Sequence, residues 1–331
     1  MRHISVIVLI LSALILSSCD TKNTFEVDIT EIASPEVKIK RYEKVIFAIP
    51  QDSFVTELPK YSEEFPLFLN GDLTDTNAIL QLKSFFVDPH MIELNNLVQQ
   101  KYPDLNDLEE SINLAFRYLQ YHFPQIPTPT VYSYVSGLDF RFPIKYANEN
   151  MIIGLDMYLG ENTKVYQVSG FPKYRNHWSV KETIVRDAME EMSSGIMGEK
   201  KASDNLLEQM VYEGKKLYFI KSMIPDLNDS ILFKFTSSQL QWITSYEANV
   251  WSYILENQLL YDNDKQMIRK FMADGPFNDL FAKASPPRVG WYLGWKIVKG
   301  YMEETDADLT QLLLETNAQR ILKLSHYKPK L

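Results

Sequence analysis

The sequence predicts an α+β fold that is predominantly α-helical and holds one small sheet. Apolar residues recur at spacings of three and four in long segments toward both ends of the chain. Residues 130–159 instead contain short β-branched and aromatic runs, divided by Gly137, Pro143 and Asn148. No repeat, low-complexity tract or linker separates these regions. We therefore expect one globular domain over residues 35–331, made of a helical lobe (35–125), a small sheet with a motif helix (126–200) and a second helical lobe (201–331).

The N-terminus has the pattern of a bacterial lipoprotein signal. A basic start, an apolar run too short to span a bilayer and a few small residues precede Cys19, the single cysteine of the chain. We expect residues 1–18 to be removed and Cys19 to be lipidated. The polar residues 19–34 then tether the lipid to a domain whose order begins near Val37. The alternatives are an ordinary secretory peptide and a short membrane anchor.

Composition excludes several classes of function. The net charge of −9 makes the chain a poor binder of polyanions, so no nucleic-acid partner is expected. With its one cysteine assigned to lipidation, the chain has no thiol nucleophile, disulfide or cysteine-ligated metal site. The sequence has no HExxH pair, no glycine-rich phosphate loop and no GxSxG elbow. We expect no cofactor and no metal, and we interpret each scattered histidine as a surface or core residue: His90, His122, His177 and His326.

In the first lobe the patterns predict helices over Ser62–Asn70, Ala78–Tyr102 and Asp107–His122. The last is the clearest, since it has an apolar stripe at helical spacing and a capping residue at Asp104 or Asn106. Prolines after His122 end it. Strands are then predicted over Val131–Val135, Phe140–Phe142 and Met151–Leu159.

The second lobe carries two further signals. Thr236 and Gln239 have the spacing of a capping box, which predicts the start of a helix that runs to about Asn257. Gly290 and Gly294 lie four residues apart, which favours the close approach of another helix or loop.

Two consecutive helices carry the charged residues of interest. In the helix around Thr183–Gly195, apolar residues occupy one side, and Glu182, Arg186, Asp187 and Glu190 gather on the other. Arg186 can therefore pair with Glu182 or with Glu190, each one turn away. In the next helix, over Leu206–Ile220, Glu213 borders the apolar seam and needs a partner. Gly214 beside it costs about 1 kcal/mol relative to Ala in a helix, which suggests that another backbone lies close.

This arrangement resembles the core of the gluzincin metallopeptidases, a zincin family. In those enzymes an edge strand precedes a helix with HExxH, and a later helix supplies a glutamate as the third zinc ligand. Here Ile152–Leu159 matches the edge strand and Glu213 matches the third ligand. Arg186 and Glu190 stand at the two histidine positions, and Asp187 stands at the general base. The resemblance implies a zincin-like domain without zinc catalysis, in which an ion pair of Arg186 with Glu190 or Glu213 fills the metal's place.

Three alternatives remain open at the level of sequence. The first is a charged helix face near an unrelated buried glutamate. The second is a Ca²⁺ or Mg²⁺ site formed by oxygens of Asp187, Glu190 and Glu213, against which the neighbouring Arg186 argues. The third is an active metal-dependent hydrolase with these unconventional carboxylate ligands.

Almost the whole mature chain resembles the gliding motility lipoprotein family GldB of the Bacteroidota. The resemblance lies in many segments in order, which include 116–124, 136–140, 153–160, Glu213-Gly214-Lys215, 251–256 and 286–294. It implies a cell-envelope lipoprotein of the gliding and type IX secretion machinery, in the outer membrane more readily than the inner, with protein partners and no enzymatic activity.

We therefore expect a peptidase-like scaffold reused for binding. The partner cleft is predicted to include Asp156, Tyr158, Arg288, Trp291 and Tyr292, with Arg288 as an anchor for a partner carboxylate. The strand Ile152–Leu159 is a candidate for strand addition by an extended segment. Core packing is the alternative role for the aromatic residues.

Overall fold

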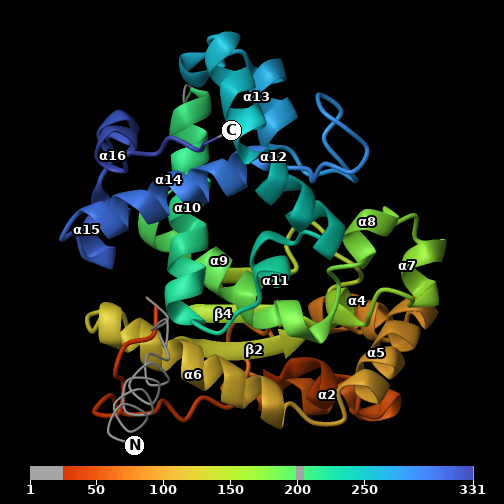
Figure 1. The fold of residues 1–331 in the computed structure, drawn as a ribbon. Helices are drawn as coiled ribbons and strands as arrows, with labels where there is room; N and C mark the ends of the chain where they lie inside the picture. The colour runs from red at the N-terminus through yellow and green to blue at the C-terminus, as the bar shows by residue number, and fades with distance from the viewer. Residues whose placement is uncertain (1–24, 199–204, 331) are drawn as a thin grey trace, which may run out of the picture.

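A four-stranded mixed sheet lies among helices that precede it and follow it in the chain (Figure 1). The structure is a computed structural model that describes residues 25–198 and 205–330. The predicted signal peptide, the lipidation site Cys19 and the start of the predicted tether lie outside the described residues. In the part described, no helix is both long and apolar enough to cross a bilayer.

The N-terminal elements lie around and below the sheet in Figure 1. In chain order they are β1 (Lys40–Arg41), α2 (Tyr42–Ile46), η1 (Gln51–Ser53), α3 (Phe54–Glu57), η2 (Leu58–Tyr61), α4 (Thr76–Phe86), α5 (Pro89–Lys101) and α6 (Asn106–His122). The predicted helix at 107–122 is thus confirmed. Its first turn is not capped by its N-cap residue, Leu105, and the Oδ1 atom of Asp104 accepts a hydrogen bond from the Asn106 amide at 3.2 Å.

The middle of the chain forms most of the sheet and leads into the motif helix. Its elements are β2 (Thr130–Tyr134), β3 (Ile144–Ala147), β4 (Asn150–Gly154), η3 (Leu155–Tyr158), α7 (Lys164–Val168), α8 (Lys173–Asn176), η4 (Lys181–Thr183) and α9 (Ile184–Met197). The strand order is β1-β2-β4-β3. The pairs β1–β2 and β2–β4 are parallel, and β3 is an antiparallel edge strand.

The C-terminal helices form the upper part of the molecule in Figure 1. They are α10 (Leu206–Met223), α11 (Asp229–Phe233), α12 (Ser237–Glu256), η5 (Leu259–Tyr261), α13 (Lys265–Met272), α14 (Val289–Glu304), α15 (Leu309–Leu314) and α16 (Ala318–Leu324). The predicted capping box of Thr236 and Gln239 begins α12, with both hydrogen bonds formed. A second capping box, of Asn205 and Glu208, begins α10.

The sheet has an apolar cluster on each side, because successive strand residues point to opposite faces. Val131 belongs to the large cluster that extends through α6, α9, α10 and α14 to Ile321 of α16. Tyr132, its neighbour, belongs to a smaller cluster of α2, α3 and α4. The large cluster joins all three predicted parts of the chain in one continuous core.

The closest helix crossing is between α10 and α14, and it depends on glycines. A Cβ atom on Gly294 would lie 1.8 Å from the carbonyl oxygen of Met210, and one on Gly214 would lie 2.3 Å from the Gly294 carbonyl. Gly290 is also enclosed, since a Cβ there would lie 2.4 Å from the sulfur of Met272. Both close approaches expected from the sequence are therefore present, and they meet at a single crossing.

Two of the helix predictions for the first lobe were wrong. Ser62–Asn70 forms turns rather than a helix, because Pro66 lacks the amide hydrogen that a helix interior requires. Ala78–Tyr102 is two helices, not one. Asp88 accepts hydrogen bonds from the amides of His90 and Met91, and Pro89 occupies the first position of α5.

The strand predictions also need correction. Phe140–Phe142 lies in a loop, and the strand begins later, at Ile144. The predicted edge strand Ile152–Leu159 is wrong in two respects: β4 ends at Gly154, where η3 begins, and β4 lies between β2 and β3. Because both sides of β4 are already paired, strand addition at Ile152–Leu159 is excluded.

The predicted tether to residue 34 is also too long. Phe25 is only 8% exposed, and its ring lies 4.9 Å from that of Tyr218 and 5.7 Å from that of Trp295. Arg117 of α6 donates to the carbonyl oxygens of Ile29 and Ile32. Residues 25–32 therefore pack along the domain, since a buried aromatic and two charge-assisted hydrogen bonds outweigh the polar character of the segment.

Gly294→Ala is expected to lower the free energy of unfolding by about 3 kcal/mol, because the helices must separate to admit the methyl group. The measurement is urea unfolding followed by circular dichroism. Gly71→Ala is the matched control, since a Cβ there would meet nothing within 4 Å. Equal unfolding midpoints for the two variants would contradict the close crossing.

Candidate functional site

The charged residues predicted from the sequence come together where α9 and α10 pack side by side. Ile184, Ala188 and Met192 of α9 are fully buried in the large core, which leaves the other side of this helix to its charged residues. Gly195 near its end approaches β3, where a Cβ would lie 3.1 Å from the ring of Tyr146. The glycine crossing fixes α10 against α14, and with it Glu213, which directly precedes Gly214.

Arg186 is the centre of this cluster, although it is only 1% exposed. Its guanidinium donates to Asp187 Oδ1 at 3.1 Å, to Glu190, and to the carbonyl oxygen of Leu232 at 3.1 and 3.2 Å. Burial would lower the pKa of Arg186, but the charges of Glu190 and Asp187 outweigh it and raise that pKa. The predicted pair of Arg186 with Glu190 is therefore present, and no pair of Arg186 with Glu213 is found.

Asp187 is held by a second cation and by a hydroxyl. The ammonium of Lys234 lies 2.8 Å from Asp187 Oδ1, and the hydroxyl of Tyr158 donates to Oδ2 at 3.1 Å. Lys234 follows α11 in the left-handed conformation, with φ of 51°. Burial, followed by the charge of Asp187, raises the pKa of Tyr158 well above its usual range, so its hydroxyl keeps its proton at neutral pH.

Lys216 of α10 links the two helices. Its ammonium lies 3.5 Å from Glu190 Oε1 and 3.5 Å from Glu213 Oε2. Burial would raise the pKa of Glu190, but four cations, with Arg186 the strongest, hold it well below its usual range. The ammonium group of Lys216 thus lies between the carboxylates of Glu190 and Glu213.

A cavity of about 420 Å³ opens beside this cluster. Two predicted cleft residues line it, Tyr158 and Arg288, together with Asp187. The other lining residues come from the loop before β3, from η3, from the segment around α8 and from the residues that follow α11 and α13: Phe140, Arg141, Pro143, Met157, Phe171, Arg175, Trp178, Ser179, Lys234 and Asp274.

The other predicted cleft residues have different roles. Asp156 is fully buried and accepts hydrogen bonds from the amides of Ser136 and Leu138, so it orders the loop after β2. Tyr292 is buried and donates to Glu247 at 3.3 Å. The centre of the Trp291 ring lies 4.8 Å from the guanidinium of Arg288, and Trp291 does not line the cavity.

Sequence reasoning missed Lys216, Lys234 and Asp274. Each is a common surface-type residue without a local pattern, and tertiary packing alone brings it to the cluster. Phe140 and Arg141 carried a signal that was interpreted as a strand, namely an arginine between two aromatic residues.

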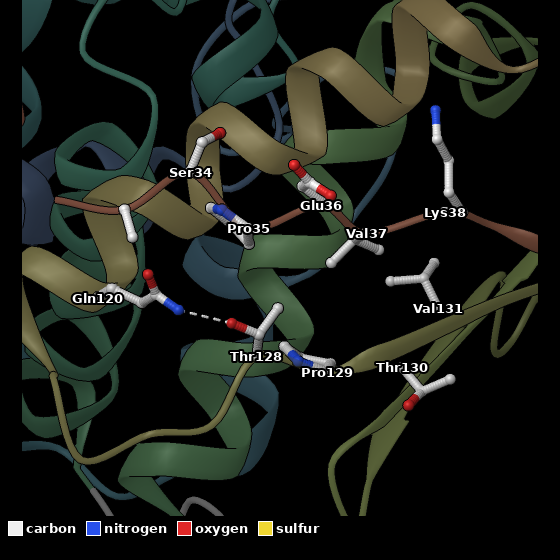
Figure 2. A pocket seen from close by; sticks show the side chains of 11 residues that line it. Ser34, Pro35, Glu36, Val37, Lys38, Gln120, Thr128, Pro129, Thr130 and Val131 are labelled. Carbon is white, nitrogen blue, oxygen red and sulfur yellow. Dashed lines mark hydrogen bonds between the residues drawn. The ribbon is translucent and has the colours of Figure 1, made fainter.

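Another cavity of about 420 Å³ lies at the N-terminal edge of the sheet (Figure 2). Residues 33–38 form one side and Thr128–Val131 the other, with Gln120 donating to Thr128 at 2.7 Å. Its one lining ammonium, that of Lys38, already pairs with Glu109 at 2.7 Å. This cavity contains none of the predicted site residues.

Within residues 25–198 and 205–330, no group of three histidine, cysteine, aspartate or glutamate side chains is placed to hold a metal ion. The carboxylates at α9 and α10 face protein cations instead. Chemically, this arrangement is a neutralised ion-pair network beside a ligand-sized cavity.

Fold and site together define an α+β protein with a charge-paired cavity between its middle segment and its C-terminal helices. The chain belongs to the gliding motility protein GldB family, whose model matches residues 22–329. It is therefore a lipoprotein related to gliding motility, anchored in the cell envelope by lipid. Comparisons with curated proteins and with solved structures gave no match.

Glu190→Gln is expected to destabilise the protein by about 3 kcal/mol at pH 7, because it leaves part of the buried Arg186 charge uncompensated. The pKa of Glu190 is lowered in the folded state, so its contribution is complete above the unfolded pKa of about 4.3 and is lost as pH falls. The gap between wild type and variant should therefore narrow below about pH 4.

The measurement is urea unfolding at pH 7 and pH 3. Glu93→Gln is the matched control, since Glu93 lies on the exposed side of α5 and makes no hydrogen bond or ion pair in the described structure. A Glu190→Gln variant as stable as this control at pH 7 would contradict the ion-pair network.

Proposed function

We propose that this chain is a non-catalytic component of the gliding motility and type IX secretion machinery, anchored in the outer membrane, which binds a protein partner in the cavity beside α9. One observation carries the proposal. Each carboxylate that could serve a metal enzyme already lies near a protein cation: Asp187 near Arg186 and Lys234, Glu190 near Arg186 and Lys216, and Glu213 near Lys216.

Protein cations in these places oppose metal binding. A divalent ion between Glu190 and Glu213 would have to displace the ammonium of Lys216 and would stand close to the charge of Arg186. Such repulsion within a partly buried site is costly, since the local dielectric constant is far below that of water. The network stabilises the helices without preparing a nucleophile or a Lewis acid.

The order of elements supports a peptidase-like scaffold as the origin of this site. An antiparallel edge strand precedes the motif helix, as in the gluzincins, but it is β3 rather than the segment first assigned. Glu213 lies on the next helix, with Lys216 between it and Glu190. We infer a metallopeptidase-like arrangement in which Arg186 and Glu190 replace the histidines and Lys216 contributes the missing positive charge.

The first test is metal content. The full chain, purified in detergent without chelators, is expected to contain less than about 0.1 equivalent of zinc by mass spectrometry. A variant with Arg186→His, Asp187→Glu, Glu190→His and Lys216→Gln removes both cations and restores the motif, so it should bind about one zinc ion. The same variant with Glu213→Gln is the control and should bind it at least tenfold more weakly.

Stoichiometric metal in the native protein, with hydrolytic activity lost on Glu213→Gln, would contradict the proposal and favour a metal-dependent hydrolase. Failure of the folded four-residue variant to bind zinc would contradict the peptidase-like arrangement.

The second test asks whether the cavity serves motility. Arg141 lines the cavity, is exposed, and makes no hydrogen bond or ion pair in the described structure, so Arg141→Glu should fold normally. Cells that carry Arg141→Glu in place of the native gene are expected to lose colony spreading at unchanged protein level. Arg269→Glu, on the exposed side of α13, is the control and should spread normally. Normal spreading of both variants would contradict a role for the cavity.

A further inference from the structure

The cavity beside α9 has a charge opposite to that of the chain. Four basic residues and two acidic residues line it, whereas the whole chain has a net charge of −9. The acidic residues are already paired, Asp187 with Lys234 at 2.8 Å and Asp274 with Arg175 at 3.2 Å. Asp274 also lies 3.6 Å from Arg288, so the four cations share two carboxylates, and the two positive charges in excess favour an anionic ligand.

Arg288 has a hydrogen-bond donor that the described structure leaves without an acceptor. The residue is 7% exposed, and its Nη2 atom donates weakly to the carbonyl oxygens of Phe233 and Lys234, at 3.3 and 3.4 Å. Its Nε atom is buried without a hydrogen bond, and the nearest carboxylate oxygen, of Asp274, lies 3.6 Å away. A buried cationic donor of this kind is normally satisfied, so the site lacks an acceptor.

The position of Arg288 is held by the surrounding structure. Its backbone is left-handed, with φ of 52°, which is unfavourable for a residue with a side chain. The ring of Trp291 lies 4.8 Å from the guanidinium, as in a cation–π contact. The guanidinium is thus fixed at the cavity wall before any ligand arrives, which reduces the ordering cost of binding.

Aromatic side chains provide a second kind of contact. Phe171 and Trp178 line the cavity, and Phe140 at its edge is 50% exposed. Phe142, two residues on, is 55% exposed. The rings of Phe140 and Phe171 lie 5.4 Å apart in an edge-to-face arrangement, so they present a common apolar wall.

We propose that this cavity binds a carboxylate and a neighbouring apolar side chain of an extended polypeptide. The carboxylate pairs with the guanidinium of Arg288, which has an unsatisfied donor, and with Arg141, while the apolar side chain packs on Phe140 and Phe171. The two aspartates in the wall favour a singly charged carboxylate over a phosphate group. This inference rests on the proposed function, since it specifies the chemistry of the partner that the same cavity holds.

The test uses the full chain in detergent and N-acetylated Ala-Gly-Ala-Phe as the probe, with a free carboxylate or a C-terminal amide. Binding is followed by tryptophan fluorescence, since Trp178 lines the cavity. The free acid should bind at least tenfold more tightly than the amide. N-acetylated Ala-Glu-Phe-Ala amide shows whether a side-chain carboxylate serves as well. Tight binding of either acid supports the proposal, and their ratio shows whether the carboxylate is terminal.

Two variants test whether the preference for the acid over the amide arises at this cavity. Arg288→Gln retains a donor for the carbonyl contacts but loses the charge, and Arg141→Ala removes a side chain that makes no hydrogen bond or ion pair in the described structure. Both should reduce the preference for the acid at least fivefold, whereas Arg269→Ala should leave it unchanged. Equal binding of the Ala-Gly-Ala-Phe acid and amide to the wild type, with the glutamate peptide binding no more tightly than that amide, would overturn the proposal. An unchanged preference in Arg141→Ala and in a folded Arg288→Gln would also overturn it.

Colony spreading of Arg141→Glu cells distinguishes a failure of this inference from a failure of the proposed function. If no peptide carboxylate binds while Arg141→Glu still abolishes spreading, the ligand class is wrong and the cavity keeps its role. If Arg141→Glu cells spread normally, the proposed function itself fails.

Discussion

The close crossing of α10 and α14 is the constraint on which the site depends. Gly214 and Gly294 let the two backbones meet, and Glu213, which directly precedes Gly214, belongs to the ion-pair cluster. Lys216 follows Gly214 by two residues, so the crossing fixes its ammonium between Glu190 and Glu213. Trp291 lies on α14, and Arg288 is the residue directly before α14 begins. Side chains at the glycine positions would move both halves of the site apart.

The charges of the ion-pair cluster are held in pairs on α9, α10 and the residue that follows α11. Buried charges are stable only when they are paired and hydrogen-bonded, and here both conditions hold for Arg186. The same cations that lower the pKa of Glu190 keep it ionised at neutral pH, so it has no proton to give. The cluster also holds two residues of the cavity wall in place, since Asp187 and Lys234 both line the cavity and pair with each other.

The sequence predicted those parts of the structure that depend on local pattern. The helices α6, α9, α10 and α12 follow from periodicity and capping, and the close approach at Gly214 and Gly294 follows from the cost of glycine in a helix. The end of β4 did not follow, because a buried apolar run gives no sign of where a strand becomes a 3₁₀-helix. Pro66 and Asp88-Pro89 are sequence signals that a helix is interrupted at these positions.

The candidate site was predictable in part for the same reason. Arg186 and Glu190 lie one turn apart on one helix, so their pairing follows from helix geometry. Lys216 and Lys234 reach the cluster only through the packing of α10 and α11 against α9, which no local spacing encodes. Asp156 and Tyr292 lie in the same segments as cleft residues, but their side chains do not line the cavity. Asp156 accepts hydrogen bonds from the loop after β2, and Tyr292 donates a hydrogen bond to Glu247.

The most direct test of the central claim, that protein cations occupy the place of a metal, is anomalous diffraction from crystals grown with zinc chloride. The account predicts no anomalous peak between Glu190 and Glu213, with density for the Lys216 ammonium near both carboxylates. A zinc peak there, with Lys216 displaced, would contradict it.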